Sequence, residues 1–185
     1  MKKKFIVASL CAVCASAFAF SACGGSGDGI SGYVDGMKKS ADGAVSVNAK
    51  VELIDEGVPV YVFNRLIQVD LQTKTASVAD SRTVYSDNFE QKTTTSTSSV
   101  DNVSGSAIVG LNLSESLVSA YEIKDGDLTC TIPQEKISEV LKSSVSAKSE
   151  MTLSVDFEGG KMVGVSYSYE NTNSRTVSVT VTYAY

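Results

Sequence analysis

The sequence has no histidine and no tryptophan, and only two prolines and four cysteines among its 185 residues. Without histidine the chain cannot form a Ser-His-Asp triad, a Cys-His dyad or a histidine-ligated metal site. Basic residues are in the minority, with 16 Lys and Arg against 21 Asp and Glu. No long basic run is present, so nucleic acid is not an expected partner. Ser, Thr and Val are abundant instead, and this composition favours strands over helices.

The first 22 residues have the layout of a secretory signal peptide. Lys2, Lys3 and Lys4 are basic, and 5–22 is an uncharged stretch rich in Ala, Val and Phe. This stretch is about long enough to span a bilayer, so a retained transmembrane anchor is the alternative. The small residues at its end favour cleavage. Cleavage removes three lysines and no acidic residue, which leaves an acidic chain that anionic membrane surfaces should repel.

The end of this stretch reads Phe20-Ser21-Ala22-Cys23-Gly24. It resembles the lipobox of bacterial lipoproteins, in which small residues precede a cysteine. The resemblance implies that Cys23 becomes the N-terminus and carries a diacylglycerol, which anchors the chain outside the cytoplasm, at the cell surface or on a periplasmic membrane face. The alternative is an ordinary signal-peptidase site at 17–19. That cut would leave Cys23 unlipidated and free to pair with Cys130.

Residues 23–32 are rich in Gly and Ser and predict a flexible tether. Residues 33–185 then predict a single antiparallel β domain, because apolar and polar residues alternate in one segment after another. The expected strands are 45–53, 58–71, 75–85, 89–100, 107–113, 117–123, 127–132, 151–157, 163–169 and 175–185. Asp125-Gly126 predicts a tight turn between two of them. A weak signal for one or two helical turns covers 33–40.

The apolar faces of the last three strands predict their register, because residues opposite each other in a hairpin share a face. A three-residue loop at 159–161 would pair Phe157 with Val163. A five-residue loop at 170–174 would pair Tyr169 with Arg175 and Val165 with Val179. The three strands would then share one continuous apolar face. The last of them would be a core strand rather than a tail.

Residues 133–145 predict an amphipathic helix that covers part of the sheet. Thr131 and Gln134 have the spacing of a capping box, and Pro133 suits the first helical turn. Ile137, Val140, Leu141 and Val145 follow at helical spacing. Plain core is the simpler interpretation of this apolar stripe, and a wall over a ligand cavity is the alternative.

Catalytic and metal-binding patterns are weak throughout. Cys130 lies on the apolar side of an alternating strand, which favours a buried thiol over a nucleophile. The acidic pairs at 55–56, 125–127 and 156–158 suit turns, and no EF-hand spacing occurs. No phosphate-binding loop and no Ser-x-x-Lys motif is present. The sequence therefore predicts a protein that is not an enzyme and has no cofactor and no metal.

Long antiparallel strands, one or two covering helices and the lipobox together resemble the half-barrel lipoprotein carriers of the LolA and LprG type. That resemblance implies a single curved sheet around an apolar cavity, and an apolar ligand as partner. The expected lining residues are Val140, Leu141, Val163, Val165, Val179 and Val181. The alternative is a protein-interaction or envelope-assembly module whose Thr-rich edge, 93–100, offers unpaired backbone groups to a partner strand.

Overall fold

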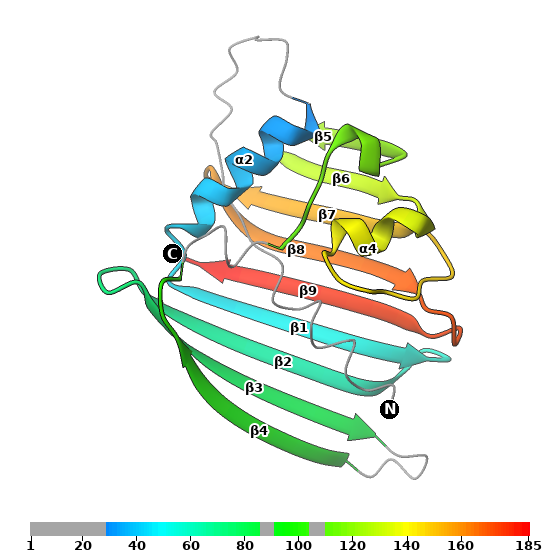
Figure 1. The fold of residues 1–185 in the computed structure, drawn as a ribbon, viewed down its shortest axis with the longest axis horizontal. Coiled ribbons are helices and arrows are strands. Elements are labelled where there is room, and N and C mark those ends of the chain that lie inside the picture. The colour runs from blue at the N-terminus through cyan, green and yellow to red at the C-terminus, as the bar shows by residue number, and fades with distance from the viewer. Residues whose placement is uncertain (1–28, 86–90, 104–109) are drawn as a thin grey trace.

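The computed structural model describes residues 29–85, 91–103 and 110–185. Within these residues nine strands form one antiparallel sheet in the spatial order β4-β3-β2-β1-β9-β8-β7-β6-β5 (Figure 1). The sheet is curved and keeps two edges, β4 and β5, so it is not closed into a barrel. The predicted mainly β class with one curved antiparallel sheet is confirmed. The signal segment and Cys23 lie outside the described residues, and what was expected of them stays a prediction.

The strands come in two runs along the chain. The first run contains β1 (Ser46–Asp55), β2 (Val58–Asp70), β3 (Thr75–Tyr85) and β4 (Gln91–Val100), and the second contains β5 (Ala120–Lys124), β6 (Asp127–Ile132), β7 (Met151–Glu158), β8 (Lys161–Glu170) and β9 (Thr176–Ala184). Antiparallel pairing of β1 with β9, from Ser46 opposite Ala184 to Ile54 opposite Thr176, joins the two runs. The C-terminal strand therefore lies at the centre of the sheet.

One face of the sheet carries the core, and we call it the inner face. In β1, for example, Val47, Ala49 and Val51 are at most 4% exposed, while Asn48 and Lys50 face solvent on the outer face. Successive side chains of a strand point to opposite faces, so the alternating sequence places apolar side chains on the inner face and polar side chains on the outer face. The outer face of β9 carries only Ser, Thr and Ala, and Thr favours the extended backbone of a strand.

Helix α2 (Ile30–Ala41) lies on the inner face over β6, β7 and β8 (Figure 1). It is longer than the predicted 33–40 helix and includes the last three residues of the predicted 23–32 tether. The Tyr33 hydroxyl donates a 2.9 Å hydrogen bond to the Gly126 carbonyl, and its ring packs edge-on against Phe157 at 5.5 Å. No described helix has the length and hydrophobicity to cross a membrane. The buried side of α2 consists of Ile30, Tyr33, Val34, Met37 and Ala41.

The described segment before β5, residues 110–119, packs on the inner face through Leu111, Leu113 and Leu117. This segment has no strand before β5, so the strand predicted over 107–113 is wrong for 110–113, and its residues 107–109 lie outside the described residues. The side chains are nevertheless buried as the predicted strand would bury them, because Leu111 and Leu113 are buried while Asn112 is exposed. The Asn112 amide donates a 2.9 Å hydrogen bond to the Val140 carbonyl, which ties this segment to the second helical region.

The helix predicted over 133–145 is wrong in its length. A 3-10 turn, η3 (Gln134–Lys136), leads into α4 (Ile137–Val140), and the chain leaves the helix with Lys142 at φ 48°. The predicted capping box does not form, because the Gln134 side chain donates instead to the Ala147 carbonyl at 2.9 Å. The Ser138 hydroxyl also bonds the backbone of Val145. Such side-chain bonds to the backbone compete with helix continuation.

The predicted loop between β7 and β8 is also wrong. The loop has two residues, Gly159 and Gly160, at φ 57° and 75°, a left-handed conformation that glycine adopts without strain. Val155 lies opposite Val165, as the predicted register requires, but Phe157 lies opposite Met162 instead of Val163. Val163 is the extra residue of a β-bulge. Met162 is fully buried and takes the inner-face position expected for Val163.

The register of β8 against β9 differs from the prediction by two residues. Val165 lies opposite Val181 rather than Val179, and Tyr169 lies opposite Val177 rather than Arg175. A shift of two keeps every side chain on its predicted face, because the side-chain period of a strand is two. The valines of β9 are therefore buried as expected.

Candidate functional site

Five of the six predicted ligand-binding residues lie in the core, and the sixth lies outside it. Val140, Leu141, Val165, Val179 and Val181 all lie in the inner-face core and are at most 3% exposed. Val163 is set apart at the bulge and is only partly buried. The five buried side chains pack against one another and against neighbouring elements. Their burial is what a packed core requires, and no described feature gives them a further role.

A second part of the inner face has a different character. We call it the β2–β3 floor. Helices α2 and α4 lie over the β5–β9 half of the sheet, and neither lies over β2, β3 or β4 (Figure 1). The partly buried Ile67 and Val69 of the floor continue the core, and Val84 is 40% exposed. Strand register places these side chains on the floor: Tyr61, Phe63, Arg65, Ile67 and Val69 from β2, and Ala76, Val78, Asp80, Arg82 and Val84 from β3.

An ion pair interrupts the apolar side chains of the floor. Arg65 and Asp80 lie opposite each other, and Nε and Nη2 of the arginine each donate a 2.8 Å hydrogen bond to one carboxylate oxygen. Both side chains are largely shielded, at 14% and 13% exposed. This two-point geometry is the strongest arrangement of an arginine and a carboxylate. Asp80 thus neutralises Arg65.

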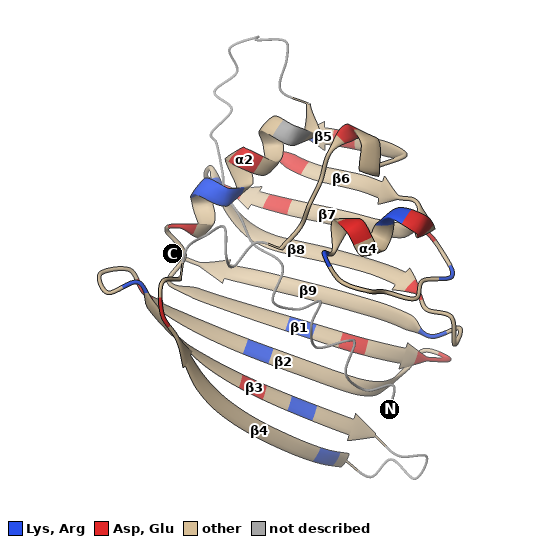
Figure 2. Cartoon of the chain, viewed as in Figure 1, with Lys and Arg blue, Asp and Glu red and all other residues tan. Residues whose placement is uncertain are grey.

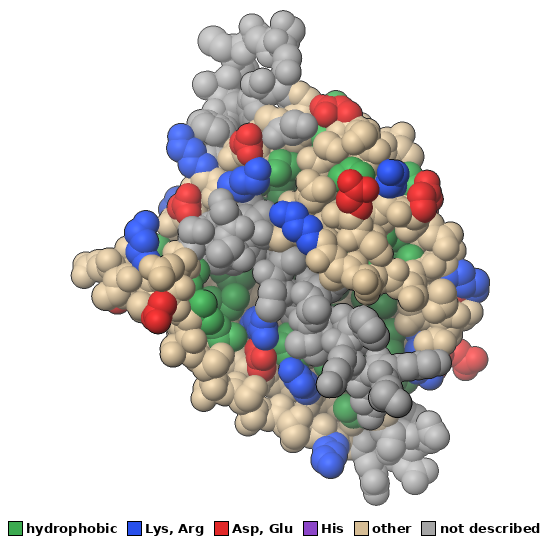
Figure 3. All heavy atoms as spheres, viewed as in Figure 1, with side chains coloured by type: hydrophobic (Ala, Val, Ile, Leu, Met, Phe, Trp, Pro, Cys, Tyr) green, Lys and Arg blue, Asp and Glu red, His purple; other side chains and the backbone are tan. Residues whose placement is uncertain are grey.

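Arg82 has no such acidic partner among the described residues. Its side chain is exposed, and its guanidinium carbon lies 5.5 Å from the centre of the Phe63 ring. Burial raises the pKa of the neighbouring Tyr61, while the positive charge of Arg82 opposes that rise. Lys92 on β4 lies on the same face, opposite Val84. Figures 2 and 3 show the charged positions of β2, β3 and β4 on this side of the molecule.

Strand β4 is an edge of the described sheet, as predicted for 93–100. It pairs with β3 without interruption from Ala76 opposite Val100 to Tyr85 opposite Gln91. All ten of its residues are exposed, and Lys92 is the only charged one. An edge strand this long, regular and weakly charged has little of the protection that proteins use against strand addition.

A buried hydroxyl lies in the core near the predicted pocket. Tyr167 is 3% exposed, and its hydroxyl has no hydrogen-bond partner among the described residues. Burial raises the pKa of this phenol, and the neighbouring Tyr169 adds to the rise. A buried hydroxyl without a partner reduces stability. Strand alternation could have located Tyr167 on the inner face but not the absence of a partner.

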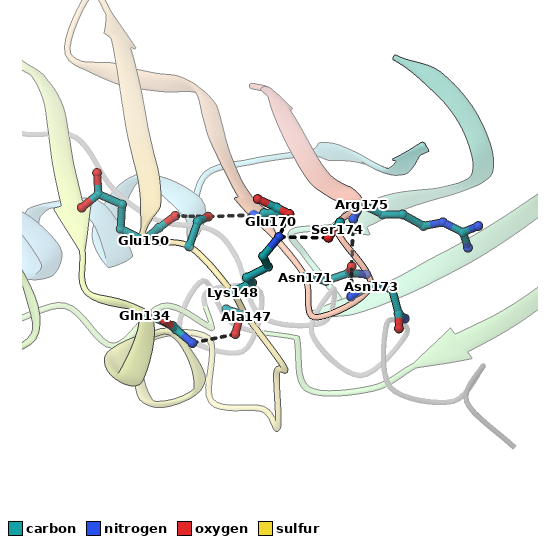
Figure 4. A network of polar contacts seen from close by, with 10 residues as sticks. Gln134, Ala147, Lys148, Glu150, Glu170, Asn171, Asn173, Ser174 and Arg175 are labelled. Carbon is teal, nitrogen blue, oxygen red and sulfur yellow. Dashed lines mark hydrogen bonds and ion pairs between the residues drawn. The ribbon is translucent and has the colours of Figure 1, made fainter. Parts of the chain in front are cut away.

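A lysine-serine contact lies where β8 turns into β9 (Figure 4). Lys148 Nζ donates to the Ser174 hydroxyl at 2.9 Å and to Glu170 Oε1 at 2.7 Å. A general base needs an amine that has lost its proton, whereas this amine forms an exposed ion pair with a carboxylate. The cluster fastens the segment before β7 to the β8–β9 turn, because the Glu170 amide also donates to the Ser149 hydroxyl.

Cys130 is a buried core residue, which confirms the prediction. It is 1% exposed on the inner face of β6, and burial raises the pKa of its thiol to about 12. The thiolate is the reactive form of cysteine, so this environment suppresses reactivity.

The acidic residues near the β5–β6 turn have structural roles, in the turn itself and in a hydrogen bond to the backbone. Asp125 and Gly126 form the predicted tight turn, at φ 55° and 99°. Asp127 Oδ1 accepts a 2.7 Å hydrogen bond from the Phe157 amide. Asp156 is exposed, and partial desolvation together with the charge of Asp127 raises its pKa. Across the described residues no group of three or more His, Cys, Asp or Glu side chains is arranged to hold a metal ion.

Comparison with known proteins adds no family. No protein-family model matches the chain, and no curated protein sequence matches it.

Proposed function

We propose that this protein is a lipoprotein anchored outside the cytoplasm through Cys23, and that it binds an apolar ligand on the β2–β3 floor without catalysing a reaction. The lipobox resemblance supports the anchor. The carrying observation for the ligand is that Tyr61, Ile67 and Val69 are only partly buried where the apolar core continues beyond both helices. Concave, largely apolar surfaces with a few placed polar groups are the usual ligand sites.

The test uses residues 23–185 with Cys23→Ser, a segment that contains every described residue. We expect native mass spectrometry to show a bound apolar molecule after purification, or a mass shift when a fatty amphiphile is added. Ile67→Glu should abolish the shift, because it places a carboxylate on the floor. Leu66→Glu is the matched control, since Leu66 is exposed on the outer face of the same strand. An unliganded mass that no added lipid changes would contradict the proposal.

A second candidate is a protein-interaction module that pairs through β4. Its support is the unbroken β3–β4 ladder and the complete exposure of β4. An envelope protein with an extended segment could then add a strand to this edge. We expect Thr95→Lys with Thr97→Lys to abolish capture of such a partner, because edge lysines oppose strand addition. Thr180→Lys, on the outer face of the central strand β9, should leave capture unchanged.

A further inference from the structure

We propose that the ligand of the β2–β3 floor is an amphiphile with an anionic head group, a carboxylate or a phosphate, bound at Arg82 and Lys92. This inference rests on the proposed function and adds the chemical class of the ligand. It follows from the distribution of charge on the inner face of β2, β3 and β4, from the packing of Arg82, and from the length of the apolar surface beside it.

The charge on this face is positive although the chain is acidic overall. Arg65, Arg82 and Lys92 are its basic residues, and Asp80 is the acidic one. The formal net charge of the whole chain is −5. Asp80 already engages Arg65 through two hydrogen bonds. Arg82 and Lys92 are therefore left as positive charges with no acidic partner among the described residues.

Arg82 and Lys92 are close enough to act on one anion. Arg82 lies opposite Thr94, and Lys92 is two residues from Thr94 on the same face of β4. Such diagonal neighbours lie about 7–8 Å apart, within reach of long side chains. The planar guanidinium can donate two parallel hydrogen bonds to a carboxylate or phosphate, and the ammonium can add a third.

Contact with Phe63 restrains the side chain of Arg82 and so favours its binding of an anion. The ring is fully buried, and the Arg82 guanidinium packs near it at 5.5 Å. Contact with an aromatic ring restrains the guanidinium and removes water from one side of it. A restrained donor loses less conformational entropy when it binds an anion.

The rest of the floor suits the apolar part of the ligand. The Val69–Ala76 pair lies six residue steps along the strands from the Phe63–Arg82 pair, a distance of about 20 Å. Apart from the internally neutralised Arg65–Asp80 pair, the inward side chains along this length are the partly buried Ile67 and Val69 of β2 and the buried Ala76 and Val78 of β3, which are 4% and 8% exposed. A head group at Arg82 and an alkyl chain along the partly buried Ile67 and Val69 of β2 would match both parts of the surface.

The experiment compares ligands that share one alkyl chain. Dodecanoic acid, dodecyl phosphate and dodecan-1-ol are titrated by calorimetry into residues 23–185 with Cys23→Ser, and inorganic phosphate is titrated alone. We expect the two anionic amphiphiles to bind at least about tenfold more tightly than the alcohol. Arg82→Gln should remove this preference without changing alcohol binding, and Arg82→Lys should keep part of it.

Lys50→Gln is the matched control, because Lys50 is an exposed cation on the outer face of the neighbouring strand β1. It should leave all affinities unchanged. Equal binding of the three amphiphiles, unaffected by Arg82→Gln, would overturn the head-group inference and leave the proposed function standing. If inorganic phosphate binds as tightly as dodecyl phosphate, the alkyl chain contributes nothing, and the inference that the ligand is an amphiphile is overturned. Binding of none of the amphiphiles would overturn the proposed function itself, and the inference with it.

Discussion

Phe63 and Arg82 lie opposite each other on β2 and β3, with the guanidinium carbon 5.5 Å from the ring centre. Arg65 approaches the same ring at the same distance. Two positive groups thus share one buried aromatic ring, and Asp80 neutralises only the second of them. This arrangement makes the floor both apolar and electropositive, and it makes Asp80 the residue on which the local charge balance depends.

Asp80→Ala should therefore destabilise the fold, by about 2 kcal/mol, because it leaves a largely buried guanidinium without its carboxylate. Denaturant unfolding followed by circular dichroism measures the change. The double variant Arg65→Met with Asp80→Leu should cost less than Asp80→Ala alone, since it removes both charges. An equal or larger cost for the double variant would show that the charge pair is not the cause.

Tyr167→Phe should stabilise the protein, by about 1 kcal/mol, because it removes a buried hydroxyl that has no partner among the described residues. Thermal unfolding of the two proteins, measured side by side, gives the difference. Tyr169→Phe serves as the comparison on the same face of β8 and only two residues away. A clear loss of stability in Tyr167→Phe would mean that the hydroxyl is hydrogen-bonded in solution.

The bulge in β8 predicts unequal roles for two neighbouring residues. Met162→Ala should cost about 3 kcal/mol, because Met162 is fully buried and truncation leaves a cavity. Val163→Ala should cost less than about 1 kcal/mol, since Val163 is the extra residue of the bulge and is partly exposed. Urea unfolding of both variants decides. The reverse order would support the three-residue loop that the sequence predicted.

Asp156 should make stability depend on pH. Its pKa is raised by partial desolvation and by the charge of Asp127, so the folded state binds its proton more tightly than the unfolded state does. Its contribution to stability therefore falls as pH rises above the ordinary carboxyl value of about 4. Asp156→Asn should stabilise the protein at pH 7, on the order of 0.5 kcal/mol after allowance for solvent screening, and change little at pH 3. A difference that is the same at both pH values would speak against this cause.

Local pattern predicted much of the fold. Alternation identified most strands and assigned faces correctly in β1 and β9, because the side-chain period of a strand is fixed by covalent geometry. The same rule explains why the two-residue error between β8 and β9 left every valine on its predicted face. Cys130 was also placed correctly, since its neighbours alternate regularly.

Local pattern failed where a side chain chooses a partner distant in the sequence. Gln134 fits a capping box by spacing, but it bonds the Ala147 carbonyl instead. In the same way Arg65 looks like an interruption of an apolar face until β3 places Asp80 opposite it. The basic surface of the floor is visible only after β2, β3 and β4 are set in register.

The sequence by itself therefore determined the strand-rich class, the inward and outward sets of side chains and the predicted export signal, because these depend on composition and on short-range periodicity. Tertiary structure alone decided that the first and last strands pair at the centre of the sheet, that Met162 replaces Val163 in the core, and that Arg82 lies against Phe63. Each of these depends on contacts between residues far apart in the chain, and the free energy of such contacts is set by the whole packed sheet.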